Sequence, residues 1–301
     1  MKLLDKNNKY IDQFYSPSGG WSKKDFIKEN KYFSMERISP YSLGSDSENW
    51  KLNNEEIISG RDRSGNEIYG TPAQQNSNYQ LYTSYSSDFI ENTTLKKYLS
   101  PYYFHDQINI SEDVTLAVEP GVIIKFYNSN NFGGLTIQGI LKAIGSEEEP
   151  IIFDSFRELI PWLGLYFTEK SANSELENIV VRRGGNKWGS YSGAGIKIKD
   201  TSVSLKNSIL EDNYNQGLWL INSSSTIDNI EFLRHNRASS GNKGKAVYID
   251  GGTPIIKNST LKNNYYGIYI RNSEPVLENL IFGEDEEKNT CEIYKNGKCH
   301  K

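Results

Sequence analysis

The chain has 301 residues, of which 36% are hydrophobic and 24% are charged, and its formal net charge is −4. This length can bury a sizeable core, in one elongated domain or two compact ones. The slightly acidic balance gives no reason to expect a nucleic-acid partner. No apolar run approaches the roughly 20 residues of a membrane-spanning helix, and the first residues lack the apolar stretch of a signal peptide.

Residues 1–77 show no internal period and predict a separate small β unit. Several of their motifs resemble the second half of a bacterial lamin-tail domain, which implies a partial immunoglobulin-like sandwich in a family of commonly exported surface proteins. The first half of that domain is absent, so strand edges would be left unpaired. We therefore expect this unit to be poorly ordered or docked as a cap on the rest of the chain. The matching motifs are Ser-Met-Glu-Arg at 34–37, the pair Asn49 and Trp50, and the segment 70–77 that starts Gly-Thr-Pro and ends Asn-Ser.

Segment 78–92, rich in Tyr and Ser, is expected to be a linker to an internal repeat that occupies residues 93–282. Aligned on its asparagines, the repeat has apolar residues two before and three after each one. A spacing of two between inward residues indicates short strands. Units this small cannot bury their own face, so stacked copies predict a parallel β-helix with coils about 4.8 Å apart. The asparagines are separated by 29, 22, 29 and 21 residues: Asn178, Asn207, Asn229, Asn258 and Asn279.

The residue just before each asparagine supplies an independent check, because these residues alternate in sign. Coils in register would place opposite charges on neighbouring strands, where each pair contributes roughly 0.2–1 kcal/mol. The asparagines themselves are expected to form a buried structural stack at a turn, each amide bonding to the copies above and below. The charged column is Glu177, Lys206, Asp228, Lys257 and Glu278.

Two segments, SPYYFHDQINISEDVTLAVEPGVIIKF at 100–126 and GGLTIQGILKAIGSEEEPIIFDS at 133–155, resemble the first coils of bacterial exported right-handed parallel β-helix proteins of the pectin-lyase-like type. The resemblance covers residues 93–282, about seven coils at this period. It implies the right-handed winding, which the columns alone do not. We predict an all-β chain in which a right-handed parallel β-helix follows a small N-terminal β unit.

Two periods are longer than the others, and both insertions follow the same strand. They should project from one edge of the stack and bring cationic and aromatic residues onto one rim. Charge-assisted contacts and ring stacking there would suit an acidic glycan. The alternative is an ordinary solvated loop, since loops collect charge. The rim residues are Arg182, Arg183, Lys187, Trp188, Tyr191, Arg234, His235, Arg237, Lys243 and Lys245.

A second column lies ten residues before the asparagines and contains Lys197, Trp219, Tyr248 and Tyr269. Inward aliphatic residues flank each of them, so these side chains should point outward. Adjacent aromatic rings on an exposed face could form a strip that stacks on sugars. Rings about 4.8 Å apart would also stack on one another, and this structural interpretation is the favoured one.

Residues 283–301 are expected to form an acidic, solvated tail that protects the last coil from edge-to-edge pairing. The tail carries both cysteines of the chain, Cys291 and Cys299. A small disulfide-closed loop is favoured over a metal site, which would need four ligands, and two free thiols are the alternative. The disulfide would imply an oxidising compartment. No metal and no other cofactor are predicted.

We predict a non-catalytic module at the cell surface or in the extracellular space, exported by a signal upstream of Met1. Its rigid β-helix would present the rim for adhesion or for binding a polysaccharide. One alternative is a polysaccharide lyase or glycoside hydrolase acting on an acidic glycan, and another is a purely structural stalk. Such enzymes gather outward carboxylates, whereas the column eight residues before the asparagines contains one acid. That column is Lys199, Ile221, Asp250 and Arg271.

Overall fold

The structure is a computed structural model that describes residues 2–4, 10–13, 27–28, 31–37, 50–53, 58–71, 83–127, 133–185, 193–235 and 243–300. The chain divides into two compact units, Met1–Ser84 and Tyr85–Lys301. In the described residues the helices are two short 3-10 turns, η3 (Lys97–Leu99) and η4 (Asp285–Glu287), and neither could span a membrane. The regular structure of both units is otherwise β.

The first unit is built from short strands in small sheets. In chain order these strands are β1 (Lys2–Leu4), β2 (Tyr10–Gln13), β3 (Ile27–Lys28), β4 (Lys31–Phe33), β5 (Met35–Arg37), β6 (Trp50–Leu52), β7 (Ile58–Arg61) and β8 (Glu67–Tyr69). Strands β1 and β2 pair antiparallel, as do β5 and β6. The remaining four form a sheet in the order β3-β4-β8-β7.

Two of the motifs in the first unit meet at a buried carboxylate. Glu36 on β5 accepts hydrogen bonds from Asn53 Nδ2 at 2.7 Å and from Thr71 Oγ1 at 2.8 Å. A buried carboxylate needs such donors because the loss of water is otherwise costly. The rings of Phe33 and Tyr69, on the paired strands β4 and β8, stack with centroids 5.2 Å apart.

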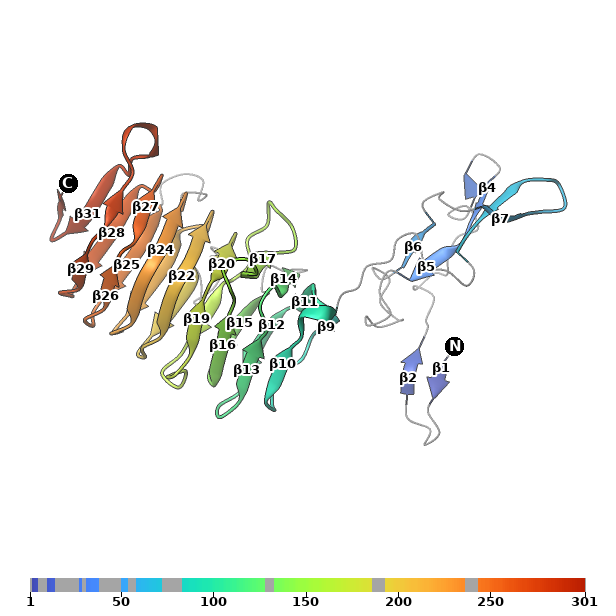
Figure 1. The fold of residues 1–301 in the computed structure, drawn as a ribbon, viewed down its shortest axis with the longest axis horizontal. Coiled ribbons are helices and arrows are strands. Elements are labelled where there is room, and N and C mark those ends of the chain that lie inside the picture. The colour runs from blue at the N-terminus through green and yellow to red at the C-terminus, as the bar shows by residue number, and fades with distance from the viewer. Residues whose placement is uncertain are drawn as a thin grey trace. The chain divides into compact units, whose positions relative to one another are not determined.

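The second unit is a parallel β-helix of about seven coils, whose strands follow one another as rungs in Figure 1. Each coil contributes one strand, or half of a long strand, to each of three faces. Face 1 contains β10 (Thr93–Leu95), β13 (Thr115–Val118), β16 (Ile140–Ile144), β19 (Glu175–Glu177), the first halves of β22 (Ser204–Glu211) and β24 (Thr226–Leu233), β26 (Ile255–Lys257) and β29 (Val276–Glu278). Because β22 and β24 are long, each bends from face 1 into face 2.

Faces 2 and 3 complete each coil. Face 2 contains β11 (Tyr102–His105), β14 (Ile123–Tyr127), β17 (Ile151–Ser155), β20 (Ile179–Arg182), the second halves of β22 and β24, β27 (Thr260–Lys262) and β30 (Ile281–Phe282). Face 3 contains β12 (Gln107–Ile110), β15 (Gly134–Ile137), β18 (Leu165–Phe167), β21 (Ala194–Lys199), β23 (Gln216–Ile221), β25 (Lys245–Asp250), β28 (Tyr266–Arg271) and β31 (Cys291–Lys295). Successive strands on each face pair in parallel.

The interior file predicted from the repeat is confirmed. Its members face one another on consecutive strands of face 1, and all are buried except the last, which is partly buried. Alternation along each strand turns these aliphatic side chains inward, where neighbours from the coils above and below cover them. The file runs through Leu176, Leu205, Ile227, Ile256 and Leu277.

The column of alternating charges is also in register, as predicted. Each acid stands opposite a lysine of the neighbouring coil, from Glu177 to Glu278. Lys257 Nζ lies 3.3 Å from Asp228 Oδ2, while the Asp228 carboxylate also accepts a hydrogen bond from Asn258 Nδ2 at 2.8 Å. These contacts lie at the surface, where an ion pair contributes at most about 1 kcal/mol.

The asparagine column forms a ladder in pairs, because Asn207 and Asn258 donate to Glu177 and Asp228 instead of to the previous asparagine. The prediction that the column is buried is wrong. Four of its members are exposed and Asn178 is half-buried. All five have a left-handed backbone, with φ between 48° and 57°, at the bend between faces 1 and 2. Asparagine tolerates this conformation better than other side-chain-bearing residues, which explains the repeat. Asn229 Nδ2 donates to Asn207 Oδ1 at 2.8 Å, and Asn279 Nδ2 to Asn258 Oδ1 at 3.1 Å.

A different polar file lies inside the helix, and its first three members stand six residues after ladder asparagines. Asn213 N–H donates to His235 Nδ1 at 3.2 Å, and His235 N–H donates to Asn264 Oδ1 at 2.9 Å. Asn264 N–H then donates to Asn289 Oδ1 at 3.0 Å. All four residues are buried. A Cβ at Gly217 would lie 2.4 Å from His235 Nε2, so this corner needs glycine.

Residues expected to be a linker also belong to the β-helix. After β9 (Thr83–Tyr85), the rings of Tyr85 and Phe89 pack on Phe104 of the first coil, with centroids 5.6 and 5.7 Å away. Phe89 is buried and forms a bridge with Ile110. This aromatic cluster packs on the first coil of the stack, within the second unit.

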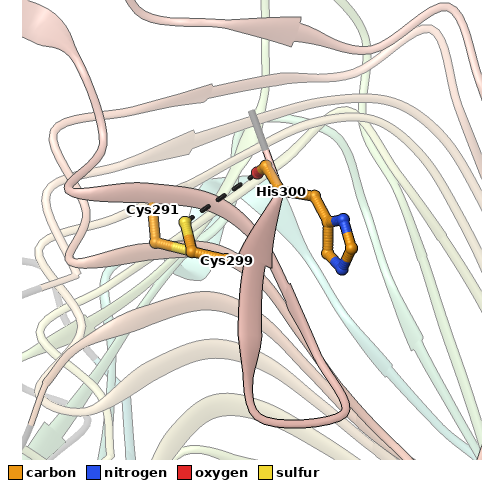
Figure 2. The surroundings of a disulfide bond; sticks show 3 residues. All are labelled: Cys291, Cys299 and His300. Atoms are coloured by element: carbon orange, nitrogen blue, oxygen red, sulfur yellow. Dashed lines mark hydrogen bonds between the residues drawn. A yellow bond between two sulfur atoms is a disulfide. The ribbon is translucent and has the colours of Figure 1, made fainter.

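The prediction that the helix ends at residue 282 is wrong, because β31 continues face 3. It pairs in parallel with β28, placing Ile293 opposite Ile268. A final strand, β32 (Lys298–His300), pairs antiparallel with β31 and covers its edge. Cys291 and Cys299 form a disulfide across this hairpin, with Cα atoms 5.8 Å apart (Figure 2).

Candidate functional site

One outward column of face 3 is aromatic or cationic on six consecutive strands, from β18 to β31. Strand alternation places it outside, since the residues before and after it are apolar and point inward on every strand except β31, where Lys295 follows it. Four of its members were predicted from the repeat, and the structure adds Tyr166 and Tyr294 at its two ends. We call this column the stripe: Tyr166, Lys197, Trp219, Tyr248, Tyr269 and Tyr294.

The rings of the stripe pack on one another. Trp219 and Tyr248 stack with centroids 5.5 Å apart, and Tyr269 and Tyr294 stack at 4.7 Å. Between these pairs, Tyr248 meets Tyr269 edge to face at 5.3 Å. Such pairs are stabilising beyond their buried area. All five aromatic side chains of the stripe are nevertheless half-buried, so each keeps part of its surface open.

Lys197 continues the stack on the one coil of the stripe that lacks a ring. Its Nζ lies 4.5 Å from the Trp219 ring and 5.0 Å from the Tyr166 ring. The residue is 7% exposed, and burial, followed by the charge of Lys199, lowers its pKa. Cation–π attraction and the apolar stem of the side chain fix it between the two rings.

Two further lysines lie beside the stripe, at the start of β25. Lys243 lies over the Tyr265 ring at 4.6 Å, and a hydrogen bond with Tyr265 raises its pKa. Burial lowers the pKa of Lys245, whose Nζ donates to the Lys243 carbonyl at 3.2 Å. Within the described ranges, neither lysine forms an ion pair with a carboxylate. Three rings surround Lys245 Nζ at 5.4–5.9 Å: Tyr248, Tyr266 and Tyr269.

The arginines of the predicted rim bind carboxylates instead of forming a free cationic cluster. Arg182 Nε donates to Asp154 Oδ2 at 2.9 Å, and Arg183 Nε donates to Asp154 Oδ1 at 2.8 Å. Arg234 Nη2 donates to Glu211 Oε2 at 2.7 Å. Asp154 is buried, so these are charge-assisted bonds that the fold itself requires. These three arginines of the predicted rim therefore already have carboxylate partners within the protein.

His235 also does not lie on the rim. It is fully buried in the interior file, and burial lowers its pKa to about 3, so the ring is neutral near pH 7. His235 lies six residues after Asn229, as Asn213 and Asn264 lie six residues after Asn207 and Asn258. This spacing is the signal in the sequence for its place in the interior file. The remaining rim predictions lie outside the described residues: Lys187, Trp188, Tyr191 and Arg237.

A pocket of about 210 Å³ opens beside the rim and is lined in part by Glu158, Arg183 and Asp212. Asp212 Oδ2 accepts a hydrogen bond from Arg234 at 3.0 Å, and Glu158 lies 4.0 Å from Arg183. Glycosidases use two carboxylates with separate environments, one of them protonated. Here both acids face arginines. Among the described residues, no group of three or more His, Cys, Asp or Glu could hold a metal ion.

A family model described as a right handed beta helix region matches residues 164–300. This range starts at β18 and includes the whole stripe and both lengthened periods. Together with the parallel register of the strands, the match shows that the second unit is a right-handed parallel β-helix, as predicted. Searches of curated proteins and of solved structures found no match.

Proposed function

We propose that this protein is a non-catalytic polysaccharide-binding module of the cell surface or extracellular space. The stripe is its binding surface, and the coil stack is the rigid support. The observation that carries the proposal is the in-register run of five aromatic side chains and one lysine over six strands of face 3. Half-buried tyrosine offers an apolar ring with a polar group, which suits sugars.

The lysines next to the stripe favour an acidic polysaccharide. Lys243 and Lys245 have ring and carbonyl contacts but no carboxylate partner among the described residues. A sugar carboxylate could therefore form a charge-assisted hydrogen bond there without displacing an existing ion pair. The rim arginines are less suitable, since a ligand would have to compete with Asp154 and Glu211.

Two features support an exported protein. The Cys291–Cys299 disulfide is typical of oxidising compartments. In the first unit, two of the motifs that resemble a bacterial lamin-tail domain meet through the hydrogen bond from Thr71 to Glu36. We propose that residues 1–77 are related to that family and attach the β-helix to a surface.

Binding of the purified chain to immobilised polymannuronate, hyaluronan and a neutral β-glucan tests the proposal. We expect the wild type to retain the acidic polymers without releasing new reducing ends or unsaturated products. The Tyr248→Ala/Tyr269→Ala double variant should bind at least about tenfold more weakly. Tyr103→Ala on face 2 is the matched control and should bind normally. Failure to bind any polymer would favour a structural stalk, whereas depolymerisation would favour an enzyme.

A further inference from the structure

The stripe is long in one direction only. Along the helix axis it offers a new side chain on every coil from Tyr166 to Tyr294. Along each strand, the next outward position toward the C-terminus carries no ring, and on the other side the rings among the described residues are confined to Tyr266 and its neighbour Tyr265 beside β28. The flanking column toward the C-terminus contains Lys199, Ile221, Asp250 and Arg271. A sugar chain lying along a strand would therefore contact one member of the stripe, and a chain lying along the axis would contact all six.

The spacing of the stripe matches a sugar chain. Neighbouring strands lie about 4.7–4.9 Å apart, which is close to the length of one pyranose unit in an extended glycan. The centroids of consecutive rings, from Trp219 to Tyr294, are 4.7–5.5 Å apart. Rings from Trp219 to Tyr294 are held by their neighbours in the stripe, so little ordering cost remains to be met on binding.

Charge along the stripe differs between its two sides. On the flanking column, Lys199 Nζ lies 3.5 Å from Asp200 and Arg271 Nε lies 3.9 Å from Asp250, so these cations face acids. On the opposite side, Lys243 and Lys245 lack such partners among the described residues. Acidic groups of a bound chain are attracted to that side, over β25 and β28.

We infer that the stripe binds a single chain of an acidic polysaccharide parallel to the helix axis, with one sugar unit over each coil. Carboxylates of the chain then turn toward Lys243 and Lys245. This inference rests on the proposed function and specifies the orientation and the length of ligand that the site accepts. Because the rings lie on successive coils, affinity grows with oligomer length until the stripe is filled.

Calorimetric titration with mannuronate oligomers of increasing length tests the inference. We expect the association constant to rise about three- to tenfold for each added unit, as expected for one further ring contact. The rise should stop at about six units, since the stripe has six members. Neutral cello-oligomers of the same lengths should bind more weakly; equal affinity would contradict the role of Lys243 and Lys245.

Shortening the stripe gives the sharper result. Tyr294→Ala removes the last member, so the affinity for the hexamer should fall to that of the wild type for the pentamer. The trimer can occupy other coils, and its affinity should stay unchanged. Tyr103→Ala should alter neither. Thermal unfolding of each variant checks that face 3 remains intact.

Two outcomes overturn the orientation while the proposed function stands. In the first, the Tyr248→Ala/Tyr269→Ala variant loses polymer binding, but the affinity of the wild type stops rising at oligomers of two or three sugar units. The other is an equal loss for trimer and hexamer in Tyr294→Ala. Absence of binding to every polymer and oligomer overturns the orientation together with the proposed function.

Discussion

The rim and the stripe both carry cations on the same β-helix, yet their positive charges have different partners. Arg182 and Arg183 share the buried Asp154 carboxylate, and Glu211 and Glu158 lie within 4.0 Å of them, so the protein itself supplies their counter-charges. Lys245 lies among tyrosine rings, and no carboxylate of the described residues pairs with it. The comparison teaches that a cluster of basic residues indicates a ligand site only where the protein has not already supplied the counter-charge.

The rim and the stripe also differ in the interactions that fix their side chains. Rim contacts are charge-assisted hydrogen bonds, which are strong and directional where one partner is buried. Stripe contacts are ring stacking and cation–π attraction, which leave part of each aromatic side chain exposed. Substitutions should therefore affect stability at the rim and ligand binding at the stripe.

The largest effect is expected at Asp154. Asp154→Ala removes the common acceptor of Arg182 and Arg183, leaving two guanidinium groups without their buried partner. We expect a loss of about 3 kcal/mol in the free energy of unfolding, at the low end for a broken buried pair because Arg182 can rehydrate. Urea denaturation measures it. Asp228→Ala, at the surface charge column, should cost less than about 1 kcal/mol; equal losses would contradict the comparison.

His235, buried beneath the rim, should make stability depend on pH. Its folded pKa of about 3 lies below the ordinary value of 6.5, so the unfolded chain binds more protons between these values. Stability is complete above pH 6.5 and falls as the pH drops, by about 2 kcal/mol at pH 5.

The control for this prediction is His235→Asn, which keeps the hydrogen-bonding pattern of Asn213 and Asn264. The difference in unfolding free energy between wild type and variant should shrink or reverse on acidification from pH 7 to pH 5. Parallel pH profiles for the two proteins would show that the histidine is not buried in its neutral form.

A direct contrast between the regions comes from neutralising one cation in each. Lys245→Gln should weaken binding to polymannuronate about five- to tenfold and reduce its salt dependence, since one charge-assisted contact is lost. Arg234→Gln should leave affinity and salt dependence unchanged, because Glu211 already occupies that guanidinium. Titrations at two ionic strengths measure both. Reversed sensitivities would assign the ligand to the rim.

The exposed asparagine ladder belongs to neither the rim nor the stripe. Substitutions there should have the smallest effect on stability and serve as a reference for both regions. Asn229 has φ of 57°, so Asn229→Ala should cost about 1 kcal/mol for the left-handed backbone. Asn229→Gly should change the free energy of unfolding by only about a few tenths of 1 kcal/mol. Thermal unfolding compares the two. A larger loss for glycine than for alanine would mean that the side-chain hydrogen bond, not the backbone, selects asparagine.

The coil stack was predictable from sequence because its causes are local and repeat. Inward aliphatic residues such as Leu205 and Ile227 recur with the period, and alternation along a strand decides which side they face. The charge column followed from the same alignment. The alignment does not show which residues are buried. A recurring asparagine suggests an interior stack, although the left-handed backbone at the bend turns these side chains outward.

The site was less predictable, because it depends on partners from other coils. Asp154 lies 28 residues before Arg182, on a coil without a ladder asparagine, so the alignment never paired them. Tyr166 lies 12 residues before Asn178 instead of ten, and Tyr294 follows the last ladder asparagine, so the aligned column contains neither. The interior file mixes histidine with asparagine, and only hydrogen bonds between coils reveal that His235 takes the place of an asparagine.

A crystal structure with a mannuronate hexamer bound tests the central claim most directly. The account predicts one oligosaccharide along face 3, with a sugar unit at each member of the stripe from Tyr166 to Tyr294 and a carboxylate near Lys245. A hexamer in the rim pocket beside Arg183, or one that crosses the stripe at a single ring, would contradict it.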